Sequence, residues 1–183
     1  MKKSFSSHSE APRLKSSAER NPAQPMKLNR WREKPIVAVI GGHKCSLKVE
    51  QQAIKLGNLL GKVGVILVCG GLGGVMKAVS MGMKEVGGTS VGILPGEDKA
   101  TANPYIDIPI PTGLGYTRNT IVVGCADIIV ALPGEYGTLS EIAFALNMKK
   151  PVIGIGAWDI TGVRQVNTPE EAIEIVKGIA GKT

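Results

Sequence analysis

Beyond Pro35, short unbroken runs of apolar residues alternate with longer segments whose apolar residues recur every three or four positions. An unbroken run predicts a buried strand, whereas the three-to-four spacing predicts a helix with one buried face. The predicted strands lie at residues 36–40, 65–69, 90–94, 105–110, 126–132, 152–156 and 162–166. The predicted helices lie at about 48–62, through 76–83, up to about 124, at about 139–148, and after Thr168. This alternation is typical of a parallel sheet covered by helices on both faces.

The pattern predicts an α/β fold with a single domain over residues 35–183. We expect a Rossmann-like, doubly wound and mainly parallel sheet of about six or seven strands. No internal repeat and no second set of core segments is visible in the sequence. Sheets of this class bind ligands at the carboxyl ends of their strands, so the loops that follow the strands are the first place to search for chemistry.

The net charge of +7 is concentrated in a leader, residues 1–34. The leader holds nine Lys or Arg against three Glu, whereas the rest of the chain holds 13 basic and 12 acidic residues. A nearly neutral domain argues against a dedicated nucleic-acid surface, which would need clustered basic residues. The leader is rich in Ser, Pro and charge and can bury little apolar surface, so it is predicted to be disordered.

Two other interpretations of the leader stay open. Met26 stands just before the predicted domain, so residues 1–25 would be an upstream extension if translation began there. The stretch is also basic, rich in Ser and poor in acids, as organellar transit peptides are, although it lacks a clear apolar helical face. Neither a secretory signal nor a membrane-spanning apolar run is apparent in the sequence.

Three cysteines, Cys45, Cys69 and Cys125, are odd in number and far apart. No CxxC pair is present, so the pattern predicts neither a disulfide framework nor a zinc site. Free cysteine within an apolar run behaves as a small buried side chain. We therefore expect a soluble, cytoplasmic protein without a metal centre.

Three glycine-rich loops follow predicted strands, and a parallel sheet brings them to one edge. They are Gly41-Gly42, the run Gly70, Gly71, Gly73 and Gly74, and the turn from Gly134 to Gly137. A glycine-rich turn that leads into a helix presents backbone N–H groups and a positive dipole end, which favour phosphate. The loops lack a complete GxGxxG fingerprint and a GxxxxGK[ST] sequence, so NAD-dependent redox chemistry and nucleotide triphosphate hydrolysis are disfavoured. A phosphate or nucleotide site is the favoured interpretation, and tight turn geometry alone is the alternative.

Two charged residues are candidates for chemistry beside these loops. Arg118 lies at a predicted helix start and can hold a phosphate or a sugar hydroxyl through its fork of N–H donors, unless it forms a surface ion pair. Glu141 can act on a substrate, but Thr138-Leu139-Ser140-Glu141 is also a T-x-x-E capping box. Glu135 places a negative charge within the proposed phosphate turn.

Other polar residues near strand ends carry weaker signals. His43 lies in a strand-to-helix loop, where a solvated histidine is as well explained as an acid or base. Asp127 at a strand start is better explained by capping or pairing than by catalysis. Trp158 and Asp159 follow a predicted strand and could line a pocket.

The sequence resembles the LOG (LONELY GUY) superfamily, whose members are often labelled "possible lysine decarboxylase". The resemblance spans residues 36 to about 179. It is carried in order by Gly70-Gly71-x-Gly73-Gly74-Val75-Met76, Arg118, and Pro133-Gly134-x-x-Gly137-Thr138-x-x-Glu141. The segments Ala102-Asn103-Pro104-Tyr105 and Thr112-Gly113-Leu114-Gly115-Tyr116-Thr117-Arg118-Asn119 resemble the branch that contains the molybdenum cofactor carrier proteins.

The resemblance implies hydrolysis of the N-glycosidic bond of a nucleoside 5′-monophosphate, with Arg118 and Glu141 as catalytic residues. It also implies a homo-oligomer, a dimer or tetramer, that packs through helices beside the site. Two positions depart from the hydrolases: Glu135 replaces the second glycine of PGGxGT, and Asn119 replaces a lysine. These departures favour a binding or carrier protein for a nucleotide or molybdopterin-type ligand. The alternatives are the phosphoribohydrolase and an oligomeric nucleotide sensor.

The sequence thus predicts a ligand site with no required cofactor and no metal. Arg118 and Glu141 are the catalytic candidates. The residues predicted to contact phosphate or ligand are Gly41, Gly42, Gly70, Gly71, Gly73, Gly74, Thr112, Gly113, Arg118, Asn119, Gly134, Glu135, Tyr136, Gly137 and Thr138.

Overall fold

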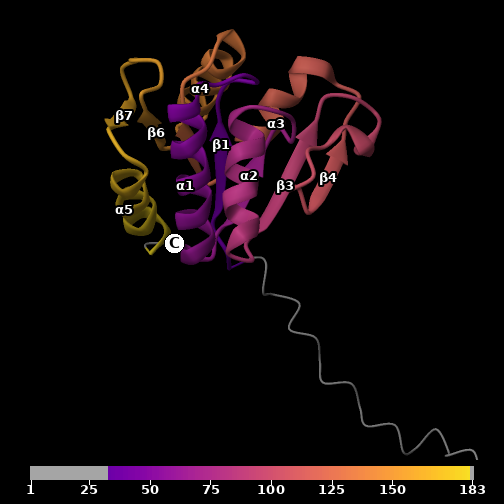
Figure 1. Ribbon diagram of the computed structural model, residues 1–183. Coiled ribbons are helices and arrows are strands. Elements are labelled where there is room, and N and C mark those ends of the chain that lie inside the picture. Colours follow the sequence, from indigo (N-terminus) through magenta and orange to yellow (C-terminus); the bar gives the residue numbers. More distant parts are fainter. Residues whose placement is uncertain (1–32, 182–183) are drawn as a thin grey trace, which may run out of the picture.

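A computed structural model describes residues 33–181, so almost all of the predicted leader lies outside the described residues. Seven strands form one sheet in the order β4-β3-β2-β1-β5-β6-β7 (Figure 1). The strands are β1 (Ile36–Ile40), β2 (Ile66–Cys69), β3 (Thr89–Leu94), β4 (Ile108–Pro111), β5 (Ile128–Ala131), β6 (Val152–Ile155) and β7 (Val163–Val166). The helices are α1 (Leu47–Val63), α2 (Val75–Glu85), α3 (Asn119–Gly124), α4 (Tyr136–Asn147) and α5 (Pro169–Ala180), with short 3₁₀ turns η2 (Lys99–Thr101) and η3 (Gly115–Arg118). The predicted doubly wound α/β fold is confirmed.

Every pair of neighbouring strands is parallel, so all strands end at the same edge, the upper one in Figure 1. β1 pairs with β2 on one side and with β5 on the other. The chain therefore builds outward from β1 to β4, then returns to β5 and builds in the opposite direction. The reversal leaves a crevice between the ends of β1 and β5, the usual ligand position in such sheets.

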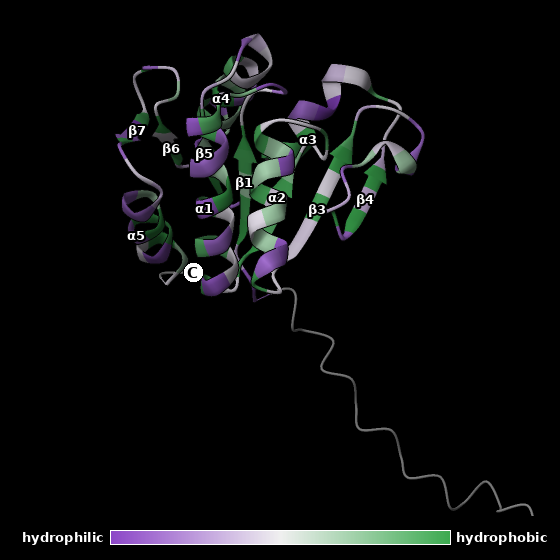
Figure 2. Ribbon diagram, in the orientation of Figure 1, coloured by the Kyte–Doolittle hydropathy of each residue, from purple (hydrophilic) through white to green (hydrophobic). Residues whose placement is uncertain are grey.

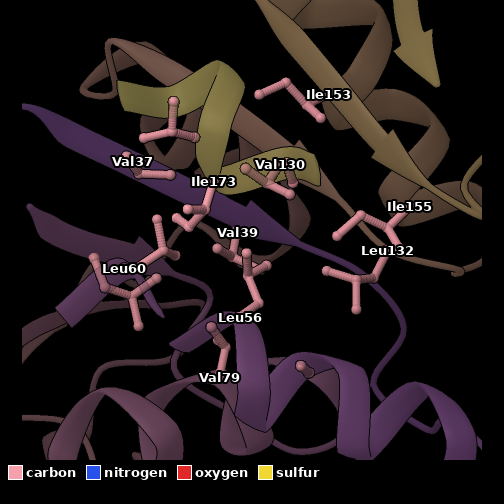
Figure 3. Packing of buried hydrophobic residues seen from close by; sticks show 14 of the residues in the cluster. Val37, Val39, Leu56, Leu60, Val79, Val130, Leu132, Ile153, Ile155 and Ile173 are labelled. Carbon is pink, nitrogen blue, oxygen red and sulfur yellow. The ribbon is translucent and has the colours of Figure 1, made fainter. Parts of the chain in front are cut away.

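The central strands of the sheet are buried on both faces, and each face has its own hydrophobic core. Val37 and Val39 of β1 point to the face covered by α1, α2 and α5, where Leu56, Val79 and Ile173 pack against them (Figure 3). The alternate residues of β1, with Val122 of α3 and Ile142 of α4, form the second core. Because neighbouring residues of a strand point to opposite faces, both faces need apolar side chains, which explains the unbroken apolar runs. Figure 2 shows these central strands in green and the exposed sides of α1 and α5 in purple.

The starts of α1 and α5 follow local sequence signals. Ser46 caps α1, since its side chain accepts a hydrogen bond from the N–H of Val49 at 3.4 Å. Thr168 caps α5 in the same way through the N–H of Glu171 at 3.2 Å, with Pro169 at the first helical position. Glu171 in turn accepts from the N–H of Asn167 at 3.0 Å, which completes a box-like cap and confirms the predicted start of this helix.

The fourth strand begins three residues later than predicted. Asp107 accepts hydrogen bonds from the N–H and Oγ of Ser90, at 2.9 and 3.0 Å, and its partner Lys84 binds the other carboxylate oxygen. These bonds anchor the loop before Ile108, so the regular ladder with β3 starts only there. β4 is an edge strand with the sequence Ile-Pro-Ile-Pro, and Ile108 and Ile110 are both exposed.

Among residues 33–181, none of the helices combines the length and the apolarity that a bilayer crossing requires.

Two glycines allow α1 and α2 to touch through their backbones. A Cβ on Gly57 would lie 2.9 Å from the backbone N of Met83, and one on Gly82 would lie 3.0 Å from that of Asn58. The Cβ of Gly82 would also collide with the carbonyl oxygen of Ile54. Backbone atoms cannot move aside as a flexible side chain can, so these positions require glycine.

Gly82→Ala should therefore lower the free energy of unfolding by about 1–3 kcal/mol, because the added methyl group forces α1 and α2 apart. Gly178→Ala is the matched control: it also lies in a helix, but no atom lies within 4 Å of its added Cβ. There the substitution should stabilise by up to about 1 kcal/mol, through helix propensity alone. Urea unfolding of both variants measures the difference, and equal midpoints would contradict the close helix contact.

Candidate ligand site at the β1–β5 crevice

The peptide groups of Gly42 join three strand-end loops. The N–H of Gly42 donates to the carbonyl of Pro133 after β5, and its carbonyl accepts from the N–H of Val75 at the start of α2, both at 3.0 Å. The loops after β1, β2 and β5 are thereby held together at the crevice. Their glycines permit this contact. A Cβ on Gly134 would lie 2.7 Å from the N of Gly42, and Gly74 adopts a positive φ of 58° directly before α2.

A cleft of about 610 Å³ opens over these loops. Its lining comes from the strand-end loops, from η3 and the start of α3, and from the first two turns of α4. Predicted site residues in this lining are Gly41, Gly42, Gly70, Arg118, Asn119, Glu135, Gly137, Thr138 and Glu141. His43, Lys44, Leu72, Met76, Pro95, Gly115 and Tyr116 also line it, together with the last two residues of β1.

The other predicted ligand residues do not line the cleft. They are Gly71, Gly73, Gly74, Thr112, Gly113, Gly134 and Tyr136. Several of them hold the surrounding loops. Gly74 precedes α2, Gly134 packs against Thr138, and the hydroxyl of Thr112 donates to the carbonyl of Leu94 at 2.7 Å. Tyr136 is 80% exposed. Direct ligand contact by these residues stays a prediction.

The first turn of α4 differs from the sequence prediction. The helix begins at Tyr136 rather than near Leu139, with Glu135 at the N-cap. Thr138 and Glu141 therefore lie inside the helix, and the predicted capping box is wrong. The first intrahelical bond at this end runs from the N–H of Leu139 to the carbonyl of Glu135 at 3.0 Å. The amides of residues 136–138 consequently have no intrahelical acceptor, and they form the positive end of the helix dipole.

Glu135 leaves this helix end accessible. Its side chain is exposed and makes no hydrogen bond to the amides of the first turn. A carboxylate surrounded by water interacts weakly with an anion, about 1 kcal/mol at 4 Å in bulk water. The negative charge that the sequence places within the phosphate turn is therefore screened by solvent.

Arg118 is the buried cation of the cleft, 8% exposed at the junction of η3 and α3. Its guanidinium lies directly against the backbone of Gly70, where any Cβ would collide with Nη2. Nη1 donates to Oδ1 of Asn119 at 2.8 Å, whereas Nε is buried without a hydrogen-bond partner within the described part of the chain. Burial lowers the pKa of Arg118, and the neighbouring charge of Glu141 opposes that shift. A cation with an unused buried donor is a strong recognition element for an anion.

Glu141 lies beside Arg118, with 3.7 Å between Oε1 and Nη1. The distance is too long for a hydrogen bond, so the carboxylate is paired by charge alone. Burial raises the pKa of Glu141 to about 7, although Arg118 pulls it down. A carboxyl group with this pKa can both give and accept a proton near neutral pH.

The weaker sequence candidates divide between the cleft and the scaffold. His43 lines the cleft. Asp127 joins β5 to β1, because its Oδ2 accepts from the N–H of Ile36 at 2.8 Å, as the capping interpretation predicted. Trp158 is outside the cleft lining, and its Nε1–H donates to the carbonyl of Gly134 at 3.0 Å and so supports the β5 loop. No cluster of three or more His, Cys, Asp or Glu within residues 33–181 could hold a metal ion.

Comparisons with known proteins assign the family. A model of the SLOG cluster4 family matches residues 34–180. The chain belongs to this family. The molybdenum cofactor binding protein of Rippkaea orientalis is 36% identical, with a TM-score of 0.76 over 80% of this chain and 97% of that one. The Moco carrier protein of Chlamydomonas reinhardtii is 36% identical, with a TM-score of 0.75 over 82% and 99% of the two chains.

A more distant relative of this SLOG cluster4 protein is an enzyme. The cytokinin riboside 5′-monophosphate phosphoribohydrolase LOG of Oryza sativa subsp. japonica is 31% identical over 121 residues, which are 61% of this chain and 49% of the enzyme. Together these matches confirm the predicted resemblance to the LOG superfamily and, within it, to the molybdenum cofactor carrier branch.

Sequence reasoning missed the role of Asn103, which is buried beneath the second glycine loop of this family member. Its Nδ2 donates to the carbonyls of Gly71 and Leu72 at 3.1 and 3.0 Å, and its backbone N–H donates to Gly71 as well. Asn103 thus fixes the path of the loop that supports Arg118. By itself an asparagine before a proline is typical of a turn, and the partners of this side chain lie more than 30 residues away.

The raised pKa of Glu141 makes the stability of the protein depend on pH. Between about pH 4.5 and 7 the folded chain keeps a proton on Glu141 that the unfolded chain has lost, so rising pH reduces the free energy of unfolding. Above pH 7 the reduction of the free energy of unfolding reaches its full size, about 3 kcal/mol. Glu141→Gln should therefore stabilise the protein at pH 8 and change its stability much less at pH 5.

Urea unfolding at both pH values measures this difference, with Glu135→Gln, at an exposed position, as the control. A gain from Glu141→Gln that is the same at pH 5 and pH 8 would contradict a raised pKa.

Proposed function

We propose that this protein binds a small phosphorylated ligand with a nucleotide-like or pterin-like ring, and carries it without turnover. One observation carries the proposal: a buried guanidinium with an unused Nε donor lines the same cleft as the open first turn of α4. Both elements favour an anion, and together they supply donors on two sides of it. The ligand is cargo, so no resident cofactor is proposed.

The energetics of the cleft suit phosphate. A hydrogen bond between a charged group and its partner contributes about 1.5–3 kcal/mol, so loss of Arg118 would weaken binding about tenfold to a hundredfold. The cleft volume of about 610 Å³ lies within the range of small-molecule sites. Leu72, Met76 and Pro95 add apolar lining, which suits a flat heterocycle.

The similar proteins support the ligand class. Two of them are described as a molybdenum cofactor binding protein and a Moco carrier protein, each with more than 95% of its length covered. In this chain the amides of residues 136–138 and the guanidinium of Arg118 would hold the phosphate of such a ligand. The apolar lining would then face its ring system.

One observation favours a second function, a nucleoside 5′-monophosphate phosphoribohydrolase. Glu141 has a pKa of about 7 and lies 3.7 Å from Arg118, and the rice relative is a phosphoribohydrolase. In this reaction Glu141 would take a proton from a water molecule while the oxygen of that water bonds to C1′ of the ribose. The N-glycosidic bond breaks and its electron pair goes to the base, which takes up the proton that Glu141 has received from water. The carboxylate stabilises the positive charge that develops on the sugar.

Incubation with AMP, GMP and a pterin monophosphate distinguishes the two functions. The carrier predicts that a ligand binds and is recovered intact, measured by calorimetry and chromatography. Arg118→Ala should lower its affinity tenfold to a hundredfold. Arg164→Ala is the control, since Arg164 is exposed on β7 and does not line the cleft.

Release of free base, abolished by Glu141→Gln without loss of folding, would establish the hydrolase instead. Failure of all three ligands to bind would contradict both functions.

We also propose that two copies of the chain associate through α3 and α4. Apolar side chains remain exposed here: Ile121 on α3, Phe144 on α4, and Met148 at the C-cap of α4, one turn after Phe144. Tyr116, just before α3, is 89% exposed. A helix that is apolar on its outer side as well as its inner side is typical of a buried position, and a second copy would bury it.

Light scattering coupled to size-exclusion chromatography should accordingly give a multiple of 19.2 kDa for the wild-type chain. Phe144→Asp should shift the mass to that of a single chain, because it places a charge in the interface. Leu47→Asp is the matched control: Leu47 is 78% exposed on α1, away from α3 and α4. A wild-type mass of one chain, or an unchanged mass in Phe144→Asp, would contradict this interface.

A further inference from the structure

Asn119 occupies the space between the two anion-binding elements. It follows Arg118 directly, begins α3, and is only 5% exposed. Its Oδ1 accepts from Nη1 of Arg118 at 2.8 Å. Its Nδ2 faces the first turn of α4, at 3.5 Å from the carbonyl of Gly137 and 3.4 Å from Oγ of Ser140.

The partners of the side-chain amide dictate its orientation. A guanidinium only donates hydrogen bonds, and a backbone carbonyl only accepts them. The amide must therefore turn its oxygen to Arg118 and its nitrogen to Gly137, since the reverse would oppose two donors and two acceptors. Ser140 completes the arrangement, because its hydroxyl donates to the carbonyl of Gly137 at 2.7 Å and leaves a lone pair for Asn119.

These bonds commit both ends of the Asn119 amide to protein partners. Its oxygen accepts from Arg118, and its nitrogen points at α4, where the carbonyl of Gly137 and Oγ of Ser140 lie 2.7 Å apart on the same side of it. We propose that Asn119 is a positioning residue: its side-chain amide links the guanidinium of Arg118 to the first turn of α4 and acts on the ligand only through Arg118. This inference rests on the proposed anion-binding function and assigns Asn119 a different task from the ligand contact expected from sequence.

The alternative position of the guanidinium explains why a fixed orientation matters. Glu141 lies 3.7 Å from Nη1, close enough to attract Arg118 but too far for a hydrogen bond. Without Oδ1 of Asn119, the guanidinium is free to turn toward this carboxylate and form a direct ion pair. That turn would withdraw its donors from an incoming phosphate.

The first test needs no ligand. Nuclear magnetic resonance resolves the Nε–Hε signals of the six arginines, and the signal lost in Arg118→Ala identifies Arg118. Its order parameter should be near 0.85 in the wild-type protein and below about 0.6 in Asn119→Ala. Thr120→Ala is the control, since this neighbour on α3 bonds only to the carbonyl of Thr117 among the described residues and lies outside the cleft lining. An unchanged order parameter in Asn119→Ala would overturn the inference.

The second test is a double-mutant cycle on the affinity for AMP. Asn119→Ala should weaken binding about tenfold in the wild-type background and should have no effect in the Arg118→Ala background. An equal loss in both backgrounds would mean that Asn119 contacts the ligand itself, which overturns the inference.

Ser140→Ala tests the same chain of contacts without changing Asn119. Ser140 lies outside the cleft lining, and alanine preserves the helix, so an effect on affinity must pass through its two partners, Asn119 and the carbonyl of Gly137. Only the effect that passes through Asn119 depends on Arg118. We expect a loss of about threefold that also disappears in the Arg118→Ala background. If the wild-type protein does not bind AMP, the same cycle is measured with GMP or the pterin monophosphate. If none of the three binds, the proposed function fails, and the order parameters still decide whether Asn119 positions Arg118.

Discussion

Two bonds made by Gly42 hold the ligand-binding edge of this protein together. One bond reaches the loop after β5 and the other reaches the start of α2, so three loops far apart in sequence share a single anchor. Glycine is needed on the partner side as well, since a Cβ on Gly134 would lie 2.7 Å from the N of Gly42. The cleft, the start of α4 and the backbone of Gly70 beneath Arg118 all depend on this contact. The parallel sheet brings the loops to one edge, and the hydrogen bonds of Gly42 connect them into a continuous lining for the cleft.

The fold was predictable because its signals are local. An apolar run of four to six residues indicates a strand that is buried on both faces, and the Thr168–Glu171 cap marks its helix at the residue where the helix begins. Predictions failed where a distant partner decides the structure. β4 starts late because Asp107 binds Ser90 and Lys84, and no spacing in the sequence reveals those contacts.

The candidate site was predictable in outline and not in detail. Glycine loops at strand ends, with Arg118 and Glu141, were enough to place the cleft. The T-x-x-E pattern at Thr138 predicted the wrong helix start. The helix begins at Tyr136, and a threonine inside a helix cannot cap its first amides. Asn103 and Asn119 could not be assigned, since an amide side chain serves many local roles and only its partners distinguish them.

The two prolines of the edge strand β4 affect whether another strand can pair with this edge of the sheet. Thr112, just past the strand, turns its N–H toward β3, where it meets the carbonyl of Leu94 at 3.2 Å. Alternate residues of a strand turn their N–H groups to the same side, so Pro109 and Pro111 occupy positions whose N–H would face outward. Proline has no such hydrogen, and the outer border of β4 therefore lacks the donors that another chain would need to extend the sheet. Ile108 and Ile110 are exposed on this strand, but without those donors another chain cannot form a regular hydrogen-bonded ladder with it. The exposed isoleucines therefore carry a smaller risk of aggregation.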